Sequence, residues 1–186
     1  MKHGNDYHWI IRITLISIVT SMVFSFVSSE VLDGAGYAVA ALLLILFIII
    51  GIVFDMLGVA VTSAQEAPFH SMASHREYGA KSALKLVRRS DRVASICNDV
   101  VGDISGIVSG ATAAVIAGNI SRDAGRSSVV TQLLVTGLVA GLTIGGKACG
   151  KAAALNRNVQ IVLLAGKVSA FFTGEKGRSG GKKREK

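Results

Sequence analysis

The chain has 186 residues, of which 51% are apolar and 17% charged, and it carries 21 glycines and a formal net charge of +8. This composition excludes a disordered or collagen-like chain, and it argues against a soluble enzyme because four long segments lack any charged side chain. These segments are residues 13–29, 34–54, 104–121 and 127–146. A bilayer core about 30 Å thick needs about 20 helical residues. The sequence therefore predicts an all-α integral membrane protein with four transmembrane helices.

The first predicted helix covers about residues 9–27, with Trp9 at the interface that aromatic side chains favour. We interpret it as an additional helix that stays in the protein and, with an outer turn, makes up residues 1–35. The alternative is a signal peptide cleaved among the small residues 25–29. The second helix, about residues 37–62, is apolar all round until Asp55.

The pattern of residues 66–90 predicts an amphipathic basic helix with Pro68 in its first turn, where proline is well tolerated. We expect this juxtamembrane helix to lie on the anionic inner leaflet, although a solvated helical hairpin has the same pattern. The excess of Lys and Arg here and at both ends predicts that both termini are cytoplasmic. Because the positive charge lies in separate loops and few aromatic residues could stack on bases, we expect no nucleic-acid binding.

The third and fourth predicted helices, about 92–118 and 128–150, carry glycines four residues apart. Such spacing forms a groove that lets helix backbones approach in lipid, so these two helices should be the packed core. We expect residues 151–172 to form a second interfacial helix, with a fifth span as the alternative. Residues 173–186 are expected to be a disordered basic tail. The glycines are Gly102, Gly106, Gly110, Gly118, Gly137, Gly141 and Gly145.

Four charged residues fall inside the predicted spans, where each costs a few kcal/mol unless it has a partner or a function. They are Asp55, Asp99, Asp103 and Lys147, all in the predicted inner half. Three carboxylates with Asn98 and Ser105 would form a set of hard oxygen ligands suited to Mg²⁺. The alternative is a buried ion pair with Lys147 and no metal site.

Several segments resemble the membrane domain of the cyclin M/CorB/CorC magnesium transporters. They are GIVFDMLGVA at 51–60, YGAKSALKL at 78–86, SDRVAS at 90–95 and GKACGK at 146–151. The resemblance covers about residues 36–172. It implies a homodimer, here through the glycine-rich helices, with a cation cavity that opens to the cytosol.

The chain departs from that family at positions that matter for cation binding. Lys147 stands at the glutamate of the closing GExxPK motif, and Gly150 stands at its proline. Asp103 falls near the asparagine of an IGN stretch, where an acid could replace that ligand. The family's cytosolic CBS regulatory domains are not expected, so regulation would need a separate cytosolic partner.

Two functions remain open at this point. The first is a divalent-cation transporter of the plasma or inner membrane, with Mg²⁺ held by the inner carboxylates and Lys147 as internal counter-ion. The second is a non-transporting scaffold or regulatory subunit with permanently paired charges, in contact with lipid or a partner protein. We expect no enzyme, because His70 and His75 are poorly spaced for a shared metal and no catalytic cluster is evident.

Overall fold

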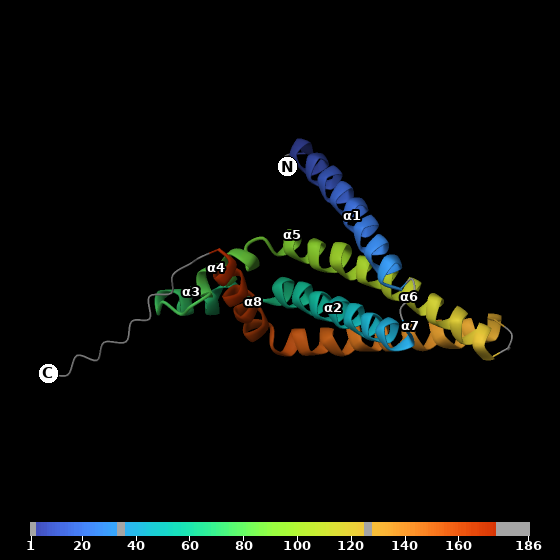
Figure 1. The fold of residues 1–186 in the computed structure, drawn as a ribbon. Coiled ribbons are helices and arrows are strands. Elements are labelled where there is room, and N and C mark those ends of the chain that lie inside the picture. The colour runs from blue at the N-terminus through green and yellow to red at the C-terminus, as the bar shows by residue number, and fades with distance from the viewer. Residues whose placement is uncertain (1–2, 33–35, 125–127, 174–186) are drawn as a thin grey trace.

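The computed structural model describes residues 3–32, 36–124 and 128–173, and every element in these ranges is a helix (Figure 1). The all-α fold class is thus confirmed for this part of the chain. The predicted outer turn around residues 33–35 and the basic tail beyond Thr173 lie outside the described residues. The helices are α1 (His3–Leu32), α2 (Tyr37–Ser63), α3 (Glu66–Ser74), α4 (Ala80–Val87), α5 (Ser90–Ala94), η1 (Ser95–Gly102), α6 (Asp103–Ala124), α7 (Ser128–Asn156) and α8 (Asn158–Phe172).

Within the described residues, four helices are long and apolar enough to cross a membrane, as the sequence predicted. Their apolar segments are Trp9–Phe26, Tyr37–Ser63, Ser90–Asp123 and Val129–Asn156. The third of these is continuous from α5 through the π-helix η1 into α6. The helix α8 has 15 residues, so it is shorter than each of these four apolar segments.

The helices α2, α6 and α7 pack against one another and form the body of the bundle (Figure 1). Glycines on α2 and α7 allow this close approach. A Cβ on Gly51 would lie 3.2 Å from the Cβ of Ser105, and a Cβ on Gly150 would lie 3.3 Å from Cγ2 of Ile52. A side chain of one helix therefore packs directly on the backbone of the next where a glycine leaves room, as is typical of helix contacts in membranes.

The glycine stripes singled out in the sequence do not make these contacts. A Cβ placed on six of the seven glycines would meet no described atom within 4 Å. The prediction that these stripes hold the third and fourth spans together is therefore wrong within one chain. The buried face of α6 is instead formed by residues such as Ser105, Val108 and Thr112. The six open glycines are Gly106, Gly110, Gly118, Gly137, Gly141 and Gly145.

A second core lies at one end of the bundle, where α3, α4 and α8 gather around the last turns of α2 (Figure 1). Phe69 is fully buried there against residues that include Val61 and Val162. This packing gives α8 a protein partner on one face, while Phe171 and Phe172 stay exposed.

The single juxtamembrane helix predicted over 66–90 is divided in the structure. It ends after Ser74, turns through residues 75–79, and resumes as α4 at Ala80. Arg76 and Gly79 both have positive φ, at 57° and 83°, and this backbone ends one helix and redirects the chain into the next. Gly79 also contacts α8 so closely that a Cβ there would lie 2.6 Å from the backbone nitrogen of Lys167.

Candidate cation site between α2, η1 and α7

Asp55 is the buried carboxylate of the bundle, with only 6% of its surface exposed. It lies on α2 between Gly51 and Gly58, the two small residues that let neighbouring helices come close. Its Oδ2 lies 3.6 Å from Nζ of Lys151 on α7. That distance allows an ion pair but exceeds a hydrogen bond, and this buried oxygen has no hydrogen-bond partner among the described residues.

Asn98 supplies a second buried oxygen from the π-helix η1. Its side chain fills the space above Gly58, where a Cβ would come within 2.7 Å of the Asn98 Cγ. The Asn98 Oδ1 also lacks a hydrogen-bond partner in the described part of the chain. Buried polar atoms are nearly always hydrogen-bonded, so two such acceptors near one glycine indicate a place where a donor, a water molecule or an ion binds. Short π-helical segments are frequent at functional sites.

Lys147 and Ser105 lie at the edges of the same junction. The Lys147 Nζ is 3.7 Å from the position that a Cβ on Gly102 would occupy, and Ser105 is 4% exposed beside Gly51. Lys147 and Lys151 are one turn apart on α7, so they share one face of that helix. We call Asp55, Asn98, Ser105, Lys147 and Lys151 the junction site.

The structure does not bring the three predicted carboxylates together. Asp99 and Asp103 are exposed and line a cleft between α1 and the continuous helix 90–124, away from Asp55. Among the described residues, no three His, Cys, Asp or Glu side chains are grouped closely enough to hold a metal ion. The expected set of three carboxylates therefore reduces to Asp55 with the oxygens of Asn98 and Ser105.

Sequence reasoning missed the role of Lys151. It identified Lys147 as the counter-ion, whereas the ion pair with Asp55 is formed by Lys151, one turn further along α7. The spacing of four residues between these two lysines was the available signal, because it places both on the same helix face. The space that Gly58 provides for Asn98 has no comparable signature in the sequence.

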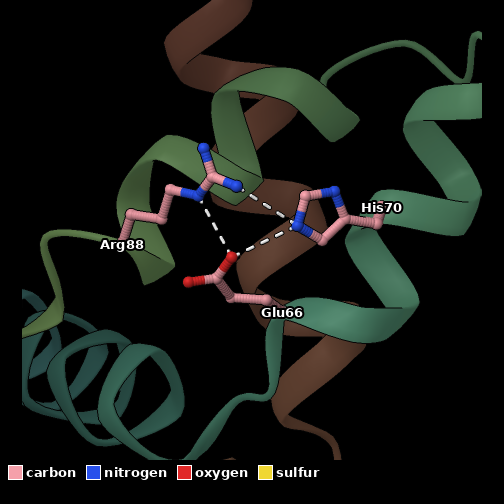
Figure 2. Close-up of polar contacts among 3 residues, drawn as sticks. All are labelled: Glu66, His70 and Arg88. Carbon is pink, nitrogen blue, oxygen red and sulfur yellow. Dashed lines mark hydrogen bonds and ion pairs between the residues drawn. The ribbon is translucent and has the colours of Figure 1, made fainter.

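A separate polar cluster joins α3 to α4, and Figure 2 shows its three side chains. Arg88 Nε donates a hydrogen bond to Glu66 Oε2 at 3.0 Å, and His70 Nε2 lies 3.2 Å from the same oxygen. The Arg88 hydrogen bond, followed by that of His70, lowers the pKa of Glu66 below the ordinary glutamate value. The cluster is exposed, so it connects two helices at the surface and leaves the junction site untouched.

His70 has two competing contacts in this cluster. Its Nε2 also lies 3.3 Å from Nη2 of Arg88. One ring nitrogen cannot donate to a carboxylate and accept from a guanidinium at the same time, so only one of the two contacts is a hydrogen bond in either tautomer. The Glu66 carboxylate therefore links α3 to Arg88 at the end of α4. The three side chains of this cluster do not form a metal-binding pattern.

Comparisons of this chain with protein-family models, with curated proteins and with solved structures gave no match.

Proposed function

We propose that this chain is a multi-pass membrane protein that binds a divalent cation of the Mg²⁺ type at the junction site and carries it across the bilayer. The observation that carries the proposal is a pair of buried acceptors, Asp55 Oδ2 and Asn98 Oδ1, that have no hydrogen-bond partner among the described residues. Carboxylate and amide oxygens are the ligands that hard cations prefer. The resemblance of residues 36–172 to the cyclin M/CorB/CorC membrane domain supports the same reading.

A membrane location is supported by the apolar surface of the helices. Large apolar side chains such as Leu42, Leu134 and Leu138 are each about two-thirds exposed, at 67%, 69% and 67%. Soluble proteins rarely leave such extended apolar surface in water. We propose the plasma or inner membrane with both termini in the cytoplasm, as the distribution of Lys and Arg favours.

The lysines of the junction site act in this proposal as internal counter-ions that the metal displaces. One carboxylate between two ammonium groups leaves an excess of positive charge, which opposes a dication until a lysine moves away. The Lys151 side chain is 52% exposed, so it can leave Asp55 for solvent without large loss of packing. Lys147, held near Gly102, stays as the second positive charge and limits how tightly the metal binds.

The Lys151–Asp55 contact favours a second candidate function. If that ion pair is permanent, the junction site is structural and the chain is a scaffold or regulatory subunit. Such a protein would use its basic segments to contact anionic lipid or a cytosolic partner. A structural ion pair is also sensitive to mutation, because removing one partner leaves an uncompensated charge on the other.

We further propose a homodimer formed through the open glycine stripe of α7. Gly137, Gly141 and Gly145 share one exposed face, and a Cβ on any of them would meet no described atom within 4 Å. Small residues every fourth position are a common contact surface for transmembrane helices. Cysteine at position 141 should therefore form a disulfide between two chains in membranes, whereas cysteine at exposed Leu138 should do so poorly.

Flux in proteoliposomes tests transport. The purified full chain is reconstituted with a magnesium-sensitive dye inside, and Mg²⁺ is added outside. We expect uptake well above that of protein-free liposomes, and a loss of at least tenfold in Asp55→Asn. Asp103→Asn makes the same acid-to-amide change outside the junction site and should keep most of the wild-type rate.

Two lysine variants separate the two candidate functions. Lys151→Gln should raise Mg²⁺ affinity, because it removes the competing ammonium, and Lys147→Glu should raise it further. Absence of flux in the wild type and in both variants would rule out transport and leave the scaffold. Flux in Lys147→Glu alone would mean that the natural chain is a transporter-like protein blocked by its own lysine.

A further inference from the structure

A cleft lies between α1 and the continuous helix 90–124. Figure 1 shows α1 inclined to the continuous helix 90–124, close to it at one end and distant at the other. The space between them has a volume of about 690 Å³ and is lined by α1, η1 and α6. Pockets of about 300–1,000 Å³ accommodate small organic molecules, so this cleft is large for a single metal ion.

The polar part of the cleft presents acceptors. Asp99 and Asp103 lie on one wall, and neither takes part in an ion pair among the described residues. On the facing wall, the hydroxyls of Thr14 and Ser17 donate to the carbonyls of Ile10 and Ile13, at 2.9 and 2.8 Å. Their donors are therefore used within α1, and their oxygen lone pairs remain for a ligand.

The charge of the cleft selects the ligand further. The described residues that line it include two carboxylates and no Lys, Arg or His. A group with a negative charge, such as a lipid phosphate, would be repelled by both carboxylates there. Trp9 also lines the cleft, on the α1 wall. Its aromatic ring can attract an organic cation by the cation–π interaction.

Apolar residues form most of the remaining surface, together with Ser21, Ser25 and Ser95. Ile13, Ile18, Met22, Ile104 and Ile107 line the cleft from both sides. A bare or hydrated metal ion makes no use of such walls, whereas the apolar body of an organic cation is stabilised by them. The two carboxylates and the apolar walls together favour a single molecule that carries a positive charge on an apolar body.

We infer that the cleft between α1 and helix 90–124 binds a singly charged, hydrophobic organic cation, with its charge beside Asp99 and Asp103. This site is distinct from the junction site, which Asn98 and Asp55 form on the α2 side of η1. Its ligand enters through the side of the cleft that α1 leaves open. The inference does not depend on whether the chain transports Mg²⁺.

Binding of a labelled hydrophobic cation to the full chain tests this inference. The chain is placed in phosphatidylcholine nanodiscs, and radiolabelled tetraphenylphosphonium is titrated in. We expect saturable binding that weakens at least tenfold in the double variant Asp99→Asn with Asp103→Asn. Asp91→Asn, the same change at an exposed position outside the cleft, should bind like the wild type.

Three further measurements complete the test. Ser21→Leu fills the cleft and keeps both carboxylates, so it should also weaken binding, and it decides the matter if the double variant does not fold. Uncharged tetraphenylmethane should not compete, and added phosphatidylethanolamine should not displace the probe. Equal binding by the double variant, equal weakening in Asp91→Asn, or competition by the neutral analogue or the lipid would each overturn the inference.

Discussion

The closest backbone contact between α4 and α8 permits a quantitative test of the packing. Gly166 on α8 faces α4, and a Cβ there would lie 2.6 Å from the carbonyl oxygen of Gly79. It would also lie 2.7 Å from both the nitrogen and the Cβ of Ala83. These atoms belong to the backbone or sit next to it, so no side chain can rotate away to make room. Gly166→Ala must push the two helices apart.

The expected magnitude follows from two opposing effects. Overpacking costs about 1–3 kcal/mol, and a rigid backbone neighbour favours the upper half of that range. Alanine in a helix interior gains about 1 kcal/mol over glycine. The net loss for Gly166→Ala should be about 1–2 kcal/mol. Gly110→Ala on α6, outside the proposed dimer stripe of α7, meets no described atom, so it should only gain, by up to about 1 kcal/mol.

Thermal unfolding of the two variants measures this difference. For a chain of this size, about 1 kcal/mol corresponds to about 2–4 °C in melting temperature. We therefore expect Gly166→Ala to melt below the wild type and Gly110→Ala at or above it, separated by about 2–12 °C in the same detergent. A Gly166→Ala variant that melts with the wild type would refute the close contact of α4 and α8. A large loss in Gly110→Ala would instead mean that a second chain also covers this face of α6.

Three other outcomes are expected. Gly58→Ala should expel the Asn98 side chain from the junction site and abolish Mg²⁺ uptake in proteoliposomes at little cost in helix content by circular dichroism; full uptake would show that Asn98 is not a ligand. Lys151→Gln should lower the melting temperature without metal but increase its rise on adding Mg²⁺, and an unchanged rise would contradict displacement by metal. Because the pKa of folded Glu66 is lowered, its stabilising contribution is present above the ordinary value of about 4.5 and is lost as pH falls through the lowered pKa. The melting-temperature difference between wild type and Glu66→Gln should thus be constant near pH 7 and shrink as the pH falls below 4.5, and a difference that stays constant on acidification would count against the Arg88 contact.

The four long apolar helices were predictable because they depend on the length of apolar segments, which can be read directly from the sequence. The predicted limits of the second span, 37–62, differ by one residue from the helix Tyr37–Ser63. The division of 66–90 was not predictable in the same way. It depends on the positive φ of Arg76 and on the contact of Gly79 with α8, and both arise from tertiary packing.

The candidate site was predicted only in part, because helix faces were harder to assign than helices. Asp99 and Asn98 are neighbours in sequence, yet one faces α1 and the other α2. The sequence placed both near one metal because it gave no indication of the π-helix or of where α1 lies. The glycine stripes misled for a related reason, since regular spacing identifies a smooth face but not what covers it.

The pairing of Asp55 with Lys151 also bears on how the chain is made. The lysine is synthesised roughly a hundred residues after the aspartate, about 5–20 s later at typical rates of synthesis. If α2 spans a membrane, as we propose, it enters the bilayer during that interval with a carboxylate that has no lysine beside it. Inserting an unpaired carboxylate costs a few kcal/mol, and the apolar side chains of the rest of α2 must offset this free energy. This accounts for α2 being the most apolar of the four long helices, although it holds the buried charge.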